Sequence, residues 1–401
     1  MEPRHIAFLT GKRGGFTHLI PIFEAMRAHD DLTHSIVAAD MHLSGNFGNT
    51  VSEVEQWADR VYRIDTMFTS DSKIARAKSI GVGIMGFAQL LDEIRPDLVF
   101  ALGDRGEVLG WVIAAMELNI PIVHIFGGDV TQGGVDEPVR HAITKMANLH
   151  LASNEQGARR IINMGEEPWR VHNVGSPVLD LVRQGRFTSA AETARKFDLD
   201  PDEPILVLLQ HSVTWQVDQA EHQIRQTMEA IDQLGYQTVA IYPCSDPGYE
   251  QIVAVLNEYA PKSYLQVHRN IPFQDFWGLL NLADCFLGNS SAGVMETASF
   301  KLPFINIGIR QEDRLRAGNT LEVEHDKAAI IGAIEKALND AGFKEQYQAC
   351  RSPYGDGHAA ERIVKVLREI PLDDKLLRKK NHLLVLNIAL RRRHEHSIDR
   401  N

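Results

Sequence analysis

The chain has 401 residues, of which 44% are hydrophobic and 24% charged, a balance that excludes disordered and fibrous proteins. Lysine and arginine total 42 against 53 acidic residues, so the formal net charge is −11. This charge argues against a nucleic-acid partner, because binding to a phosphate backbone needs a basic surface.

The three cysteines, Cys244, Cys285 and Cys350, lie far apart and indicate neither a disulfide framework nor a zinc site. The first residues, MEPRHIAFLT, lack the apolar core of a secretory signal. No apolar run approaches the ~20 residues of a membrane span. We therefore expect a cytoplasmic protein without a membrane partner.

Short β-branched runs alternate with helical patterns through the first half of the chain. In order these runs are HIAFLT, IPIFEAMRAH, HSIVAAD, PDLVFALGD, VLGWVIAAMEL, IPIVHI and VRHAITKMANL. Such alternation predicts βαβ units on a parallel sheet. The run GVGIMG at 81–86 matches the dinucleotide-binding fingerprint in letters only, because SKIARAKSI before it is typical of a helix rather than a strand.

A second series of strand-like runs begins near Pro204, with ILVLLQ, QTVAIYP, YLQVH, ADCFLG and LPFINIG separated by helical patterns. Two series of similar size predict an α/β protein of two Rossmann-like lobes, with the ligand in the cleft beyond the carboxyl ends of the strands. The sequence DLDPD at 198–202 imitates a calcium loop, but Glu203 stands where that loop needs glycine. We expect a solvated turn there.

The patterns divide the chain into four segments. A first lobe is predicted over 1–176, a second over 177–357 and a closing helix over 358–370, with the boundary in VGSPVLD, where Gly, Ser and Pro interrupt the pattern. The extension 371–401 carries eight Lys or Arg against four acids, and the apolar octet LLVLNIAL separates its two basic runs. We expect the octet to pack on a neighbouring subunit; the alternative is a basic helix on a membrane surface.

A glycine-rich turn follows the first predicted strand, in TGKRGG. Gly11, Gly14 and Gly15 would let the backbone approach a ligand closely, while Lys12 and Arg13 present cations. That combination is typical of a phosphate-binding turn. An ordinary turn with solvated charges remains the alternative.

Ionisable residues also follow later strands. Asp104 and Arg105 come after PDLVFAL, Asp129 and Asp136 come after IPIVHI, and His211 ends LVLLQ in the second lobe. Carboxylates from neighbouring strand ends are typical of general acid/base chemistry. The same acids could cap the helices that follow, and a single histidine is often structural. Capping and catalysis are not exclusive, so both interpretations stay open.

The strongest local signal is ADCFLGNSSAGVMET. After the strand comes a turn made of Gly288, Asn289, Ser290 and Ser291. A helix is expected over 292–300, and its N-terminus would offer amides and hydroxyls to a diphosphate. Glu296 would accept from ribose hydroxyls, and Arg310, beyond the next strand, would face the same pocket. A serine-rich helix cap is the plainer alternative.

Together, GDR, the GG-acid turn before DEPVRHAITK, LQHSVT, GNSSAGVMET and YGDGHAAERI resemble the UDP-N-acetylglucosamine 2-epimerase family over roughly residues 4–370. The likeness is to the hydrolysing branch, which supplies N-acetylmannosamine for sialic and related nonulosonic acids. The non-hydrolysing branch would be expected to show GDT and an H-R-x-E-N stretch, and neither appears. The resemblance implies a glycosyltransferase-B-like fold, a UDP-N-acetylglucosamine substrate and a homodimer or homotetramer.

The resemblance also implies roles for single residues. The first lobe would bind the sugar, with Asp104 and Asp136 as acid/base groups and His211 near the reacting sugar. The second lobe would hold the nucleotide diphosphate. The implied diphosphate-binding set is Arg13, Arg105, His268, Ser290, Ser291, Glu296 and Arg310, with Asn289 in the same turn.

One position departs from the family pattern. Phe126 stands where the family's epimerases often carry glutamate, in H-I-E-G-G, and a phenylalanine cannot move a proton. Three explanations are open. Asp104, Asp129 and Asp136 divide the work, water takes the missing role, or the chain acts on a different sugar.

The expected reaction is elimination followed by hydration. The proton at C2 of the sugar leaves as UDP departs from C1, giving a glycal; water then adds at C1 and a proton returns to the opposite face of C2. No cofactor is required, and the 17 histidines contain no H-E-x-x-H zinc motif. The alternatives are a non-hydrolysing 2-epimerase, a hydrolysing 2-epimerase of another UDP or GDP acetamido sugar, a glycosyltransferase, and a non-catalytic nucleotide-sugar sensor.

Overall fold

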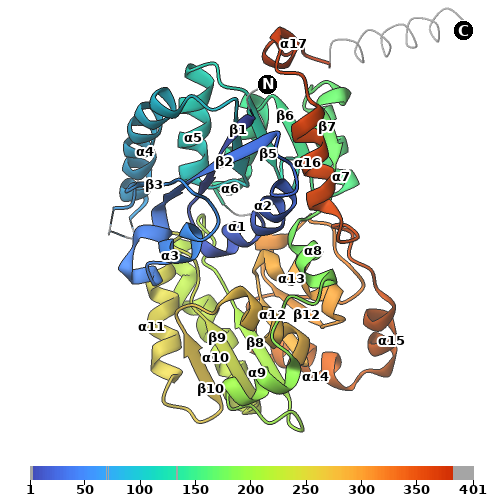
Figure 1. The fold of residues 1–401 in the computed structure, drawn as a ribbon. Helices are drawn as coiled ribbons and strands as arrows, with labels where there is room; N and C mark the ends of the chain where they lie inside the picture. The colour runs from blue at the N-terminus through green and yellow to red at the C-terminus, as the bar shows by residue number, and fades with distance from the viewer. Residues whose placement is uncertain (1–2, 69, 71, 132–133, 383–401) are drawn as a thin grey trace, which may run out of the picture.

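The computed structural model describes residues 3–68, 70, 72–131 and 134–382, which fold around two parallel β-sheets (Figure 1). Within these residues the first sheet has seven strands and the second has six. The predicted α/β fold of two Rossmann-like lobes is therefore confirmed.

The first sheet is built entirely from residues before 174. Its spatial order is β3 (Val61–Ile64), β2 (Leu32–Ala39), β1 (Arg4–Thr10), β4 (Leu98–Leu102), β5 (Ile122–Ile125), β6 (Leu149–Ala152) and β7 (Val171–Asn173). All neighbouring strands are parallel. Because the order reverses between β1 and β4, the ligand crevice is expected beyond the carboxyl ends of those two strands.

Helices cover both faces of this sheet. Along β1, Ile6 and Phe8 belong to a core shared with α2, whereas Ala7 and Leu9 belong to a core shared with α4 and α5. The helices of the first lobe are α1 (Arg13–Thr17), α2 (Ile20–Met26), α3 (Val51–Glu55), α4 (Lys73–Ile94), α5 (Gly106–Glu117), α6 (Asp136–Met146) and α7 (Glu155–Asn163). The run GVGIMG lies inside α4, so the expectation of a helix there is confirmed.

The second sheet repeats the same topology. Its order is β10 (Leu265–His268), β9 (Gln237–Ile241), β8 (Ile205–Leu209), β11 (Cys285–Gly288), β12 (Phe304–Ile307) and β13 (Thr320–Val323). Its helices are α9 (Ala190–Lys196), α10 (Ala220–Leu234), α11 (Tyr249–Tyr259), α12 (Phe273–Leu282), α13 (Ser291–Met295), α14 (Lys327–Asn339) and α15 (Ala341–Ala349). Here the order reverses between β8 and β11, which places a second crevice after those strands.

The chain crosses between the lobes at 174–177 and again near Tyr354, where Ser176 N donates to the Tyr354 carbonyl at 2.7 Å. After the first crossing comes α8 (Val178–Arg183), and after the second comes α16 (Ala359–Glu369), which packs on α2. Asp180 of α8 accepts from the backbone N–H groups of Ala359 and Ala360, so the two crossings are tied together. The helix expected over 358–370 matches α16, while the domain boundaries stay predictions.

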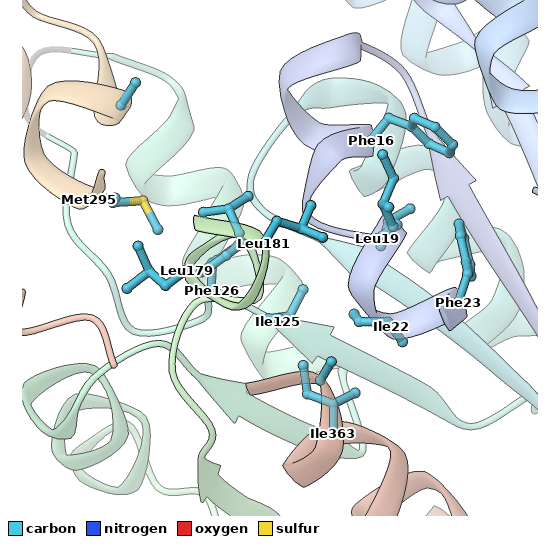
Figure 2. Close-up of a cluster of buried hydrophobic side chains, with 14 of the residues drawn as sticks. Phe16, Leu19, Ile22, Phe23, Ile125, Phe126, Leu179, Leu181, Met295 and Ile363 are labelled. Atoms are coloured by element: carbon cyan, nitrogen blue, oxygen red, sulfur yellow. The ribbon is translucent and has the colours of Figure 1, made fainter. Parts of the chain in front are cut away.

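Buried side chains from both lobes meet around α8. Figure 2 shows Ile125 and Phe126 of the first lobe, Leu179 of α8 and Met295 of α13 in one apolar cluster. This cluster lies beside the interlobe cleft, and Phe126 and Met295 also line it. The apolar contacts explain why Phe126 is 93% shielded from solvent, with only 7% of its surface exposed.

The described part of the C-terminal extension packs on the chain's own first lobe. Leu376 in the short helix α17 (Asp374–Leu377) is buried, and its carbonyl accepts from Arg170 at 2.7 Å. Lys379 donates to the Ala147 carbonyl at 2.7 Å. The octet at 383–390, expected to contact a neighbouring subunit, lies outside the described residues.

One predicted element was wrong. The continuous helix expected over 292–300 is a five-residue helix, α13, followed by a 3-10 turn at Thr297–Phe300, with the break at Glu296. The Glu296 carboxylate accepts from the Trp277 indole at 2.5 Å, so its side chain is held toward α12. None of the helices in the described part of the chain has the length and apolar content to cross a bilayer.

Candidate active site between the lobes

The two crevices face each other across a cavity of about 300 Å³. Its walls come from the turns after β1 and β4 in the first lobe and after β8, β9 and β11 in the second. The predicted residues that line it are Arg13, Asp104, Arg105, His211, Ser290, Ser291, Glu296 and Arg310. Those outside the lining are Asp129, Asp136, His268 and Asn289. A larger hollow of about 750 Å³ beside the two chain crossings holds none of these residues.

Two aspartates with opposite pKa shifts stand on this side of the cleft: Asp104 lines the cavity, and Asp136 lies behind the lining, 3.8 Å from Arg310. Burial tends to raise the pKa of Asp104, but the Arg140 guanidinium, which donates to its carboxylate, holds that pKa at about 2. Burial raises the pKa of Asp136 to about 6, and the negative charge of Asp104 adds to this effect. One carboxyl is thus ionised throughout the physiological range, and its neighbour exchanges protons near neutrality.

Arg140 is the residue that orders this acidic region. Its guanidinium is fully buried and donates to the Asp129 carbonyl at 3.0 Å, to Glu137 at 2.8 Å and to Thr131 Oγ1 at 2.6 Å, in addition to Asp104. It connects the turn after β4 to helix α6, which carries Asp136 at its first position. The arginine therefore fixes both aspartates relative to each other.

Asp129, predicted as an acid/base group, has its carboxylate committed elsewhere. Its oxygens accept from Ser153 Oγ at 3.0 Å and from Asn154 Nδ2 at 2.8 Å. Arg314 lies 3.8 Å away and itself lines the cavity. The geometry therefore favours a structural place for Asp129, beneath the cavity wall.

The turn after β11 provides hydroxyls and a cation. Ser290 Oγ accepts from the Ala292 N–H at 3.3 Å and so caps α13, as one of the two interpretations expected. Arg310 donates to the Asn289 carbonyl at 3.1 Å, and its other terminal nitrogen lies 3.8 Å from Asp136 of the opposite lobe. Arg310 thus lies between the turn at Asn289–Ser290 of the second lobe and Asp136 of the first.

Asn289 and His211 support each other across β8 and β11. Asn289 accepts from the His211 N–H at 2.7 Å and donates to the His211 carbonyl at 2.9 Å. The ring nitrogen His211 Nδ1 accepts from the Cys244 N–H at 3.1 Å, which places the ring proton on Nε2. Burial, with the charge of Arg310, holds the pKa of His211 well below its usual range. The imidazole is therefore a neutral hydrogen-bond donor.

Two arginines predicted to hold the diphosphate are already paired. Arg105 donates to Glu107 at 2.9 Å and, across the cleft, to Asp246 at 3.0 Å and Ser245 at 3.1 Å. Arg13 forms a two-pronged pair with Glu53. Arg105 therefore ties the two lobes together as well as lining the cavity.

His268, which the resemblance implied for diphosphate binding, lies outside the cavity lining. His268 is the last residue of β10, and its ring packs edge-on against Phe197, 5.4 Å between centroids. The next two residues, Arg269 and Asn270, line the cavity instead. Burial raises the pKa of Glu296 to about 7, and this carboxyl lies beside Trp277.

Sequence reasoning passed over several lining groups. They are His18, Arg269, Trp277 and Arg314, with Ser245 and Asp246 as partners of Arg105. Asp246 lies in the turn CSDPG that follows β9, and ligands of parallel sheets bind beyond the carboxyl ends of the strands, so this position could have been marked from sequence. His18 lies in helical sequence, where nothing local marks it as part of a site.

The lining is also richer in cations than the acidic chain as a whole. Its cations are Lys12, Arg13, Arg105, Arg269, Arg310 and Arg314, and its carboxylates are Asp104, Glu107 and Glu296. A cluster of guanidinium groups in a chain of net charge −11 fits an anionic ligand such as a diphosphate.

The model of the family described as UDP-N-acetylglucosamine 2-epimerase matches residues 24–368. A protein of Legionella pneumophila named UDP-N,N'-diacetylbacillosamine 2-epimerase (hydrolyzing) is 35% identical, covering 94% of this chain and 99% of its own. A UDP-N-acetylglucosamine 2-epimerase of Neisseria meningitidis is 30% identical, covering 85% and 89%.

Solved structures agree on the fold. The crystal structure of the UDP-GlcNAc 2-epimerase from Neisseria meningitidis bound to UDP-GlcNAc superposes with a TM-score of 0.78 at 17% identity, covering 91% of this chain and all of that one. The Methanocaldococcus jannaschii UDP-GlcNAc 2-epimerase, in complex with UDP-GlcNAc and UDP, gives 0.76 at 19% identity, covering 91% and 99%. The two-lobed glycosyltransferase-B-like arrangement is confirmed.

Proposed function

This chain belongs to the UDP-N-acetylglucosamine 2-epimerase family, and we propose that it is a hydrolysing 2-epimerase that turns a UDP-linked 2-acetamido sugar and water into the free 2-epimer and UDP. The observation that carries the proposal is the aspartate pair with divergent pKa values, Asp104 and Asp136, opposite Arg310. Neighbouring carboxyls whose environments push their pKa values apart are typical of acid/base sites.

Asp136 is the base of the elimination step. Its carboxylate takes the proton from C2, the C2–H electrons form the C1=C2 double bond, and the C1–O pair leaves with UDP. A carboxyl with a pKa of about 6 is mostly ionised at neutral pH, yet it is a stronger base than an ordinary aspartate. Arg310 and the hydroxyls of Ser290 and Ser291 stabilise the negative charge that grows on the departing diphosphate.

Hydration of the glycal needs a proton on the opposite face of C2. In one concerted step Asp104 relays a proton from water to C2, the C1=C2 electrons form the new C2–H bond, and the water oxygen bonds to C1 as it loses that proton. Arg140 keeps Asp104 ionised in the resting cavity, so this carboxyl accepts a proton only during turnover. The proton on Asp136 passes to solvent, which returns both carboxylates to their resting state. The neutral His211 donates a hydrogen bond to the sugar or diphosphate and transfers no proton.

Two sugars are candidate substrates. UDP-N,N'-diacetylbacillosamine is the first, because the relative at 35% identity is named for it. UDP-N-acetylglucosamine, the substrate predicted from the sequence, is the second, because the Neisseria meningitidis relative is named for it. Both carry the diphosphate at C1 and the acetamido group at C2, so the proposed chemistry is the same for each. A cytoplasmic location and a homodimer or homotetramer stay predictions.

Product analysis tests this function. The purified chain is incubated with each UDP sugar, and the products are separated by anion exchange and identified by proton NMR. We expect the free manno-configured sugar and UDP in equal amounts. A nucleotide-linked epimer would indicate the non-hydrolysing reaction instead, and a thermal shift with UDP but no product from either sugar would indicate a sensor.

A further inference from the structure

The cavity has a wall that the proposed chemistry does not use. In a pyranose ring C4 lies opposite C1, so a sugar with its diphosphate at Ser290 and Arg310 directs C4, C5 and C6 toward the first lobe. The first lobe lines the cavity with charged residues, among them Lys12, Arg13 and Asp104, and also with a mostly apolar group made of Thr17, His18, Leu19, Leu102 and Phe126. This second group is the wall that the proposed chemistry leaves free to contact C4, C5 and C6.

Two aromatic rings dominate this wall. The rings of His18 and Phe126 meet edge to face, 4.8 Å between centroids and 75° between planes. Phe126 is buried and has a backbone φ of +67°, a region that residues other than glycine rarely adopt. The strained backbone, between His124–Ile125 and Gly127–Gly128, directs a large apolar ring to a fixed place.

This wall offers few hydrogen bonds. His18 Nδ1 is buried and has no partner among the described residues, while burial lowers the pKa of His18 to about 3 and keeps the ring uncharged. The Thr17 hydroxyl already donates to the Arg13 carbonyl at 3.1 Å. A ligand therefore finds one unpaired ring nitrogen here, beside an apolar surface.

A buried hydroxyl without a partner loses its hydration and gains nothing in return. A hydroxymethyl group at C5 would place such a hydroxyl against Phe126, whereas a methyl group would pack on the ring. An acetamido group at C4 supplies one amide to the His18 nitrogen and a methyl to the apolar surface. The wall thus fits a 4-acetamido-6-deoxy sugar better than a 4,6-diol.

We propose that His18 and Phe126 form a specificity pair that selects a UDP-linked 2,4-diacetamido-2,4,6-trideoxyhexose over the corresponding 2-acetamido sugar with hydroxyls at C4 and C6. The assignment rests on the proposed function and deepens it by naming the class of sugar. It also gives Phe126 a role at the position where the family's epimerases often carry glutamate: its ring contacts the sugar, and the acid/base work stays with Asp104 and Asp136.

Three UDP sugars separate the contributions of C4 and C6 in the unmodified enzyme. They are UDP-N,N'-diacetylbacillosamine, UDP-2-acetamido-2,6-dideoxyglucose and UDP-N-acetylglucosamine. We expect kcat/KM to fall in this order, by about tenfold or more at each step, since a polar group left unpaired in a built site discriminates strongly. Equal kcat/KM for all three, within about threefold, would overturn the specificity pair and leave the 2-epimerase function standing.

Substitutions test whether the side chains of His18 and Phe126 cause the preference among the three sugars. Phe126→Gln supplies hydrogen-bond partners at similar length, so it should move the kcat/KM ratio toward UDP-N-acetylglucosamine by at least about tenfold. Phe126→Leu, the matched control, keeps an apolar side chain and should keep the order of the three sugars. His18→Phe removes the ring nitrogen and should raise KM for the 4-acetamido sugar alone.

The outcomes distinguish this inference from the function on which it rests. An unchanged ratio in Phe126→Gln, in protein that still binds UDP, would refute the role of Phe126. Failure of the unmodified enzyme to release UDP from any of the three sugars would refute the 2-epimerase function itself. Should a variant fail to fold, the sugar series on the unmodified enzyme still decides the inference.

Discussion

Replacing Asp136 by asparagine is expected to lower kcat by about 10³-fold or more while UDP affinity stays within about threefold, because asparagine has the same shape but cannot accept a proton. Asp136 lies outside the cavity lining but within 3.8 Å of Arg310, so its loss removes the base without opening the diphosphate seat. Steady-state release of UDP gives kcat, and calorimetric titration with UDP gives the affinity.

Asp198→Asn is the matched control. This aspartate lies in the exposed turn at 198–202 with a φ of +48°, a conformation that asparagine tolerates well, so kcat should not change. Asp104→Asn should also abolish turnover, but it removes one of the two carboxylates that pair with the buried Arg140, the other being Glu137, and is therefore expected to destabilise the fold as well. A kcat for Asp136→Asn within about tenfold of the unmodified enzyme would refute its role as base.

Replacing Arg310 by glutamine is expected to lower kcat/KM by about 10²–10³-fold, since it removes a preorganised positive charge from the place where the leaving group becomes negative. UDP affinity should fall as well, because the same guanidinium holds the ground-state diphosphate. The matched control is Arg225→Gln, a partly exposed arginine of α10 paired with Glu221 and Glu258, which should leave both quantities unchanged.

The pH dependence of kcat/KM gives a second test of Arg310→Gln. Asp136 must be ionised to act as base, so kcat/KM of the unmodified enzyme should increase as pH rises through about 6. The charge of Arg310 lowers the pKa of Asp136, so removing it should move this acidic limb to higher pH. If the acidic limb of kcat/KM stays at the same pH in Arg310→Gln, Arg310 does not influence the pKa of Asp136.

Much of this site can be predicted from sequence, because ligands of parallel sheets bind beyond the carboxyl ends of the strands. Asp104 follows β4 and His211 follows β8, and the parallel topology brings the carboxyl ends of such strands to one edge of each sheet. The turn at Ser290 follows from the same rule. Their convergence on one cavity needs only two facing sheets, which the alternation of strands and helices already predicts.

Other features depend on contacts that no local pattern records. Arg105 donates to Asp246, which lies 141 residues later in the sequence. The motif GDR alone therefore does not predict this contact between the lobes. Asp129 and Asp136 look equivalent in sequence, yet only the fold commits Asp129 to Ser153 and Asn154. His268 came from the resemblance alone, and only the fold shows that its ring packs on Phe197 while Arg269 lines the cavity.

Phe126 shows how one substitution can mislead when it is considered by itself. The absence of glutamate suggests a missing acid/base group and a possible sensor. In the fold, two aspartates with separated pKa values remain, and Phe126 belongs to an apolar cluster with Leu179 and Met295 (Figure 2). This placement supports the specificity role proposed for Phe126 over the loss of a catalytic group.

In the proposed mechanism the C2 proton is exchanged with water during elimination and hydration. Proton NMR of the free sugar formed in heavy water measures this exchange directly. We expect one deuteron at C2 of every released molecule. A product that keeps its original proton at C2 would contradict the glycal route and the division of work between Asp104 and Asp136.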